Sequence, residues 1–580
     1  MRGNRLWTVL GIALLAGLVA AYLSMPERGV PDDAPSLDEM AREIGAPIME
    51  NLQHGHVPGR SGEVMLVPKP HSYIIGEWDL TTLTSGTPTL TNSHPNPWDY
   101  IAQVPLILYG PPYVAVGEQV RRQVDIADIA PTYAALLGMN ALDADGEVLT
   151  EAVADSPNKA PKLIFTVILD GGGWNALQEH PDSWPTIQRL REGGTDYLNA
   201  DIGSAPSITG ALHATMGTGV YPTTHGIPGN QMRGADGKNT DTWLENADPR
   251  YLEVPTVSEL WDEQNDNEPV VGTVSYEGWH LGMIGHGAYR DGGDKDIAVL
   301  WQQDEERWYI NEDYYELPSY LRPDTEPALS AYEDTLDERD AIPDGLWFGH
   351  DLDEIRDPVV CPGSPAFVQL TGDAVVDVIK KERLGRDAVT DLFWVEMKMP
   401  DFAGHRWTMD GPEEADVLRE TDKQLARFKA QLDRSVGRGN YVLAISADHG
   451  QQPLPDIYAG WRINSQELLA DIETRFGDIL EKVTTTDLFV DLEAVESEGV
   501  DLEDVARYLG TYTIGDNVPD DATGAESVPE ARLDDTLFAG AFPTEFFQSA
   551  TPADMQGYGP GTYPESRLDR FAPAPSTGDE

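Results

Sequence analysis

The sequence predicts an α/β fold in which a mainly parallel central sheet is flanked by helices. Residues 163–169 (LIFTVIL) form a continuous apolar, β-branched run, which is typical of a central strand covered on both faces. Two further buried strands are predicted at 393–395 (FWV) and 441–445 (YVLAI), with helical patterns around 374–381 and 413–432. Because strands that alternate with helices usually pair in parallel, these elements indicate one sheet with helical layers.

The folded body is expected to begin near Glu63 and to contain two blocks. In the first block, 64–67 and 104–109 are predicted strands and 126–137 is a predicted helix. The acidic, proline-terminated stretch that follows resembles a linker. Before the first block, we expect a membrane-directed segment at 1–25 and a tether at 26–62 with one short helix near 37–44. The first block spans 63–138 and the linker spans 139–161. The main catalytic domain is expected at 162–550, with a cap or insertion at about 290–360, followed by a flexible tail at 551–580.

The composition excludes several classes of function. The 580-residue chain carries a formal net charge of −59, so it would be repelled by phosphate backbones, and we expect no binding to nucleic-acid polymers. Its single cysteine, Cys361, excludes an internal disulfide and a thiolate-rich metal site. Any zinc ion must therefore be held by histidine and aspartate.

The N-terminus predicts export. Arg2 and Arg5 precede an apolar run at 6–23, which is near the minimum length for crossing a bilayer. An uncleaved signal anchor, attaching the protein to the membrane, and a cleaved signal peptide both fit this pattern. Either interpretation places the catalytic body outside the cytoplasm.

Carboxylates and imidazoles follow the predicted strands. Asp170 ends the first run, Asp448 and His449 end the third, and Asp401 and His405 lie four residues apart after the second. Since ligands bind at the carboxyl ends of parallel strands, these side chains are expected to converge. Hard oxygen and imidazole ligands from several strand ends suit a two-metal phosphoryl-transfer site. Taken singly, each motif also fits an ordinary polar turn.

Thr209 is the candidate nucleophile. It directly precedes a stretch from Gly210 that can start a helix, where backbone N–H groups favour an anionic phosphate. A hydroxyl becomes an effective nucleophile when a metal stabilises its alkoxide. The alternative is that Thr209 and Ser207 are ordinary helix N-caps.

Together, four segments between about 163 and 452 resemble the alkaline phosphatase superfamily, and most closely its type I phosphodiesterase/nucleotide pyrophosphatase branch. The segments are VILDGGG, SITGALHATMGTGVYPTTHGIPGN, MPDFAGHRW and SADHG. The resemblance implies an alkaline-phosphatase-like fold and a centre with two Zn²⁺ ions, for which other divalent metals are possible. By this resemblance, Thr209 is the nucleophile, Asn230 holds a phosphoryl oxygen, one zinc binds Asp170, Thr209, Asp448 and His449, and the other binds Asp401 and His405.

The second zinc lacks one ligand in this resemblance, because the family takes a further histidine from a segment downstream of D-H-G. No histidine follows His449, but residues 63–138 resemble the C-terminal portion of the family. We therefore expect a circular permutation in which His94 completes the second zinc site. Pro95 stands where the family has glycine, and the alternative is that His94 is a surface-loop histidine.

The predicted substrate class depends on a pair of basic side chains that this sequence lacks. Phosphomonoesterases of the superfamily add a Lys-x-Arg pair, whereas the matching region at 275–280 has neither lysine nor arginine. This favours small-molecule phosphodiesters or nucleotide pyrophosphates, cleaved through a phosphoryl-threonine intermediate. Trp279, His280, His286 and aromatic residues at 301–315 either line a leaving-group pocket or pack in the core.

Three functions remain open from the sequence. The first is a phosphodiesterase or nucleotide pyrophosphatase, and the second is a phosphomonoesterase, sulfatase or phosphonate hydrolase of the same superfamily. The third is a catalytically inactive, membrane-tethered binding protein. The sequence makes no prediction of the oligomeric state.

Overall fold

The protein was analysed as a computed structural model that describes residues 29–75, 92–154, 160–244, 246–322, 329–355, 363–455, 457–519 and 528–563. The predicted membrane-directed segment at 6–23 and Cys361 lie outside these residues. Within the described ranges, none of the helices combines the length and apolar character needed to cross a bilayer.

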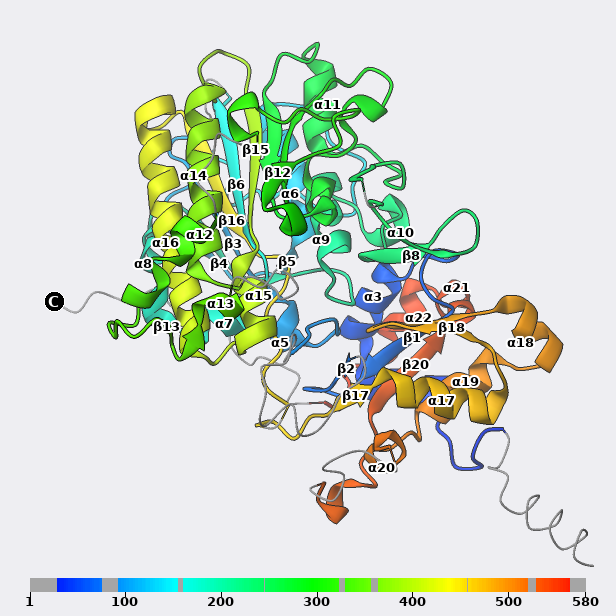
Figure 1. The fold of residues 1–580 in the computed structure, drawn as a ribbon. Coiled ribbons are helices and arrows are strands. Elements are labelled where there is room, and N and C mark those ends of the chain that lie inside the picture. Colours follow the sequence, from blue (N-terminus) through cyan, green and yellow to red (C-terminus); the bar gives the residue numbers. More distant parts are fainter. Residues whose placement is uncertain are drawn as a thin grey trace, which may run out of the picture.

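The central sheet confirms the α/β prediction. Ten of its strands lie within the described residues, in the order β12-β11-β10-β15-β6-β16-β3-β7-β4, with β5 paired to β7. Three parallel neighbours form its middle, namely β15 (Asp391–Met397), β6 (Leu163–Leu169) and β16 (Tyr441–Ser446). Every residue of these strands is buried, as their apolar runs predict. Figure 1 shows these strands between two layers of helices.

The sheet continues beyond these three strands in both directions. One side continues through β10 (Val271–Val274), β11 (Ile297–Gln302) and β12 (Arg307–Tyr309), and the other through β3 (Gln103–Tyr109), β7 (Thr195–Asp201), β4 (Glu118–Val120) and β5 (Val124–Asp125). The strand β3 pairs antiparallel with β16, so the N-terminal block enters the central sheet. The region expected as a surface insertion at 290–360 instead contributes two strands, because its IAVLW run is buried against β10.

Helices cover both faces of the sheet. One layer contains α8 (Pro185–Gly193), α14 (Pro365–Lys381) and α16 (Pro412–Leu432), and the other contains α6 (Ile129–Leu137), α9 (Thr209–Thr218) and α11 (Val257–Gln264). The predicted helices at 126–137, 374–381 and 413–432 all fall within these elements or the short 3₁₀ turn before α6. Apolar side chains of both layers and the sheet form the main hydrophobic core.

A second, smaller sheet lies beside the first (Figure 1). Its order is β18 (Leu480–Val483), β19 (Asp487–Val490), β1 (Val64–Pro68) and β20 (Phe538–Pro543). Helices α17 (Ser465–Phe476) and α19 (Leu502–Leu509) pack with it around a separate core. The predicted strand at 64–67 therefore belongs to this sheet, between two strands from the C-terminal part of the chain.

The region expected as a tether at 26–62 differs from the prediction. Its predicted short helix is α2 (Leu37–Ile44), which begins with a capping box between Ser36 and Glu39. A further helix, α3 (Ala46–Gly55), packs in the same apolar cluster as α2 because its Met49 and Leu52 are buried. The short helix α22 (Pro552–Gln556), from the region predicted as a flexible tail, packs against α3, while residues 564–580 lie outside the described residues.

Candidate metal centre and active site

Three buried carboxylates lie at the carboxyl edge of the central sheet. Asp170 directly follows β6, Asp448 follows β16 by two residues, and Asp401 lies in α15 (Met399–Trp407), which starts just after β15. These three residues are at most 1% exposed. Because the three strands are parallel neighbours, their ends bring these acids together as the sequence predicts.

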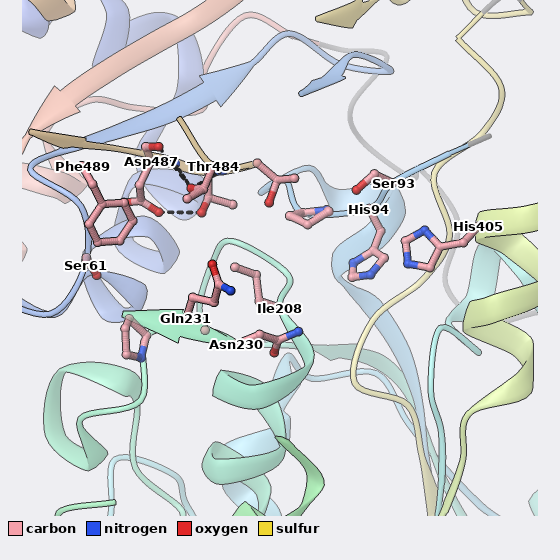
Figure 2. Close-up of a pocket in the computed structure, with 15 residues that line it drawn as sticks. Ser61, Ser93, His94, Ile208, Asn230, Gln231, His405, Thr484, Asp487 and Phe489 are labelled. Carbon is pink, nitrogen blue, oxygen red and sulfur yellow. Dashed lines mark hydrogen bonds between the residues drawn. The ribbon is translucent and has the colours of Figure 1, made fainter. Parts of the chain in front are cut away.

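His94 reaches this edge from the N-terminal block. Its Nε2 lies 3.4 Å from Asp401 Oδ1, and Nε2 of His405 lies 3.3 Å from the same oxygen. The His94 ring also stacks on that of His449, with 3.7 Å between ring centroids. Figure 2 shows His94 and His405 with their rings close to each other. The structure thus brings His94 to the two residues with which it was predicted to share a cation.

Backbone carbonyl groups orient the three imidazoles. Nδ1 of His94 lies 2.9 Å from the Ser207 carbonyl oxygen, Nδ1 of His405 lies 2.7 Å from that of Asn92, and Nδ1 of His449 lies 3.0 Å from that of Gly450. A ring whose Nδ1–H donates to a carbonyl presents Nε2 as a lone pair, which is the usual arrangement of a metal-binding histidine. The chain therefore provides three oriented nitrogen atoms that could bind a metal ion.

The donor set fits divalent cations. His94, Asp401 and His449 bring ligand atoms within 4.8 Å of one another, and so do Asp170, Asp448 and His449. Among the described residues, four of these atoms are buried and have no hydrogen-bond partner: Asp170 Oδ1, Asp401 Oδ1, Asp448 Oδ2 and His449 Nε2. Such orphaned polar atoms are costly unless a further group satisfies them. Hard oxygen and imidazole donors of this kind suit zinc.

Four more ionisable side chains line the centre, and no sequence motif predicted a metal-site role for any of them. Nζ of Lys398 lies 2.8 Å from Asp170 Oδ2 and 2.7 Å from Asp401 Oδ2. Nε2 of His280 lies 3.2 Å from Asp170 Oδ2, and Asp170 forms a further group of candidate metal ligands with His280 and His213. Glu396 Oε1 lies 3.6 Å from His280 Nε2. The available signal was the charged pair Glu396 and Lys398 at the end of an otherwise apolar strand.

The buried lysine sets the charge of its neighbours. Burial disfavours the charged form of Asp170, but Lys398 and His280 outweigh that cost and hold the pKa of Asp170 well below its usual value. In the same way His405 and Lys398 lower the pKa of Asp401 to about 2. Burial and the nearby Asp170 carboxylate raise the pKa of Asp448 well above its usual value. One ammonium thus faces several carboxylates, which leaves negative charge for bound cations to neutralise.

Thr209 is the first residue of α9 and is 2% exposed. Its hydroxyl makes no hydrogen bond within the described part of the chain. The next residue, Gly210, donates its N–H to Oδ1 of Asn230 at 2.9 Å, which directs the Asn230 amide nitrogen away from the helix. The Ser207 hydroxyl, in contrast, already has hydrogen-bond partners: it lies 2.8 Å from the carbonyl oxygen of His94 and 3.0 Å from that of Asn96.

A cavity of about 270 Å³ opens beside the centre. Its lining includes His94 and His405 at one end, Asn230 between, and Phe489 with residues 484–487, where β18 turns into β19, towards the other end (Figure 2). The aromatic residues considered for a leaving-group pocket are not among its lining residues; Trp301 and Tyr315 are buried in the main core instead. The cavity therefore lies between the two sheets, which sequence patterns could not predict.

Comparisons with known proteins agree with this geometry. A family model described as type I phosphodiesterase / nucleotide pyrophosphatase matches residues 164–510. The chain is 25% identical over 406 residues to a protein named calcium-transporting ATPase from Myroides odoratus, covering 61% of this chain and 73% of that protein. It is 22% identical over 408 residues to alkaline phosphatase PafA of Elizabethkingia meningoseptica, covering 60% and 73%. The crystal structure of wild-type PafA superposes with a TM-score of 0.51 at 19% identity, covering 67% of this chain and 85% of that one, so the two share a fold.

Proposed function

Because the chain belongs to the type I phosphodiesterase/nucleotide pyrophosphatase family of phosphoester hydrolases, we propose that it cleaves phosphodiesters or nucleotide pyrophosphates with Thr209 as the nucleophile. One observation carries this proposal. Among the described residues, carboxylate and imidazole atoms without hydrogen-bond partners lie next to His94 and His405. These two histidines line a cavity whose wall also includes Asn230, which accepts the Gly210 N–H of the Thr209 helix.

In the proposed reaction, the Thr209 oxygen attacks phosphorus and the bond to the leaving oxygen breaks. The Asn230 amide nitrogen donates to a phosphoryl oxygen, while its amide oxygen keeps the Gly210 N–H. Thr209 begins α9, so the positive end of the helix dipole favours the same charge. Water then attacks phosphorus, the bond to Thr209 breaks, and the hydroxyl is regenerated. Two bound divalent cations would supply the positive charge that stabilises the threonine alkoxide and the phosphoryl oxygens.

The proposed cation ligands fall into two sets. His94, Asp401 and His405 would hold one cation, and Thr209 with three further residues would hold the other, namely Asp170, Asp448 and His449. His449 also lies against the His94 ring and belongs by distance to a group with His94 and Asp401. The Nε2 atom of His449 is 3.3 Å from Asp448 Oδ2 and 3.7 Å from Asp170 Oδ1, which supports its place in the second set.

The cavity supports a diester in preference to a monoester. Its lining residues include neither lysine nor arginine, and they include the acidic Asp487. Lys398 is 4% exposed and bound between Asp170 and Asp401, so it is not placed to contact a substrate directly. A monoester dianion would gain little from such a surface, whereas the second ester group of a diester has room beside Phe489. The relatives named alkaline phosphatase favour the alternative, a phosphomonoesterase.

The test compares hydrolysis of bis-p-nitrophenyl phosphate and p-nitrophenyl phosphate by the zinc-loaded protein. We expect the diester to turn over faster, and faster turnover of the monoester would favour the alternative. Thr209→Ala should abolish turnover and the phosphoryl-threonine detected by mass spectrometry of quenched enzyme, while Thr209→Ser retains a hydroxyl and part of the activity. Full activity in Thr209→Ala would exclude this nucleophile.

A permuted chain order would account for the N-terminal block. The family model begins at residue 164, yet His94 and β3 come from residues that precede this match. We infer that residues 63–138 correspond to the C-terminal portion of the family. A variant in which residues 29–154 are moved behind residue 563 through a flexible linker should fold and bind zinc as the natural chain does. Loss of the fold in that variant would count against a permutation.

A further inference from the structure

A second group of acidic side chains lies at the amino edge of the central sheet, on the side away from the catalytic centre. Asp262 lies in the last turn of α11, and Asp294 and Asp296 lie in the loop that leads into β11. Because β11 runs parallel to β10 and β10 to β15, the residue before β11 lies at the edge opposite to Asp401 and Asp448. This group is therefore separate from the catalytic ligands.

The three carboxylates share one small volume. Each offers an oxygen atom, and these atoms all lie within 4.8 Å of one another. Asp262 is 4% exposed and Asp296 is 7% exposed, whereas Asp294 lies at the surface. In addition, Asp262 Oδ1 is buried and has no hydrogen-bond partner among the described residues. A buried carboxylate oxygen without a donor is unfavourable unless a cation or a proton satisfies it.

No basic side chain of the described residues pairs with this group. The two nearest in sequence bind elsewhere: Arg290 pairs with Glu263 at 3.6 Å, and Lys295 donates to the carbonyl oxygen of Glu312. Burial and the Asp294 carboxylate raise the pKa of Asp262 to about 7. Burial and the neighbouring acids also raise the pKa of Asp296 well above its usual value. The carboxyl groups are thus gathered without a basic partner among the described residues and tend to hold protons, which a bound divalent cation would displace.

Glu259, one turn before Asp262 in α11, is the other acid that faces the group, and it is already compensated. Its Oε1 lies 2.9 Å from Nδ1 of His286, and its Oε2 accepts the N–H of Thr256 at 2.7 Å. Among the described residues, the three aspartate side chains have no histidine or N–H partner of this kind, and Asp262 contacts the Asp294 carboxyl group instead. The uncompensated part of the cluster is therefore limited to them.

We infer that Asp262, Asp294 and Asp296 bind a calcium-class divalent cation that joins α11 to the start of β11. The ligands are all oxygen atoms, which suits a hard cation. Calcium binds oxygen atoms at about 2.3–2.6 Å in a flexible geometry, so oxygens within 4.8 Å of one another can share one ion. Magnesium demands near-ideal octahedral geometry and keeps several waters, so three carboxylates on two separate segments suit calcium better.

Calcium binding to the zinc-loaded full chain tests this site. Titration calorimetry in calcium-free buffer containing potassium chloride and magnesium chloride should show one calcium site per chain, with a Kd below about 1 mM. Calcium should also raise the thermal unfolding midpoint, because the ion binds the folded state alone. Magnesium at the same concentration should produce a smaller shift. Absence of both calorimetric binding and a calcium-dependent midpoint shift would overturn the inference.

Three variants separate this site from general attraction to an acidic surface. Asp296→Asn and Asp294→Asn should each weaken calcium binding at least tenfold and leave the zinc content unchanged. Asp294 is exposed, so Asp294→Asn decides the outcome if the buried variant fails to fold. Asp313→Asn removes the same charge from an exposed side chain outside the cluster and should bind calcium as the natural chain does. Equal calcium binding by Asp294→Asn and Asp313→Asn would overturn the site.

Discussion

Replacing Lys398 by methionine should destabilise the zinc-free protein strongly. The ammonium group is buried and lies 2.8 Å from Asp170 and 2.7 Å from Asp401. Methionine has a similar length but no charge, so the two carboxylates would lose the cation that holds their pKa values low. Removing one partner of a buried ion pair costs about 3–5 kcal/mol, because the remaining charge stays buried and unpaired. We therefore expect a loss of about this size in the free energy of unfolding.

Urea unfolding of the natural chain and the variant, each with and without zinc, measures this loss. Bound cations would neutralise Asp170 and Asp401 in the variant. The difference in free energy of unfolding between the natural chain and the variant should therefore be smaller with zinc than without it. Lys423→Met is the matched control, since the Lys423 side chain is 62% exposed and its buried partner Glu420, at 3.1 Å, also pairs with Arg339. Loss of this solvated lysine leaves Glu420 compensated and should cost about 0–1 kcal/mol. A zinc-free loss in Lys398→Met no larger than that of the control would refute the reasoning.

Four further outcomes are expected. His94→Ala should lower zinc affinity at least about tenfold, because it removes an oriented nitrogen ligand; an unchanged zinc content in a competition with chelator would contradict this. Asn230→Ala should lower kcat about 10²–10³-fold, because it removes a donor to the phosphoryl oxygen. Single-turnover kinetics on the folded variant measure this loss. Phe489→Ala should raise the KM for aromatic diesters and leave zinc content unchanged, whereas an unaltered KM would remove Phe489 from the substrate pocket. Burial and Asp125 raise the pKa of Asp128 from 3.8 to about 7, so the natural chain should lose stability as pH rises through this range. In Asp128→Asn, the urea midpoint of unfolding should fall less steeply with pH than in the natural chain. Equal slopes would show that Asp128 does not cause the pH dependence.

The central strands and their catalytic ends could be predicted because their signals are local. A buried parallel strand needs a continuous apolar run, and the run at 163–169 became β6 with the predicted bounds. The acids Asp170, Asp401 and Asp448 follow such runs within four residues, so their convergence required only that the strands be parallel neighbours. The prediction of a tether at 26–62 was wrong because it relied on local composition alone. The second helix of this region is stabilised by packing against residues that are distant in the sequence, where the local composition indicated a loop.

Hydrophobic runs and short motifs are properties of neighbouring residues, so the fold class, the central strands and the side chains able to act as ligands follow from the amino-acid order. Tertiary packing was needed to place Lys398 between Asp170 and Asp401 and to bring Asp262 to Asp294 and Asp296. It also placed residues 484–487 and Phe489 against the cavity beside the candidate metal centre. These arrangements join segments that are far apart along the chain. Their contacts arise from how helices and sheets pack against each other, which no local pattern encodes.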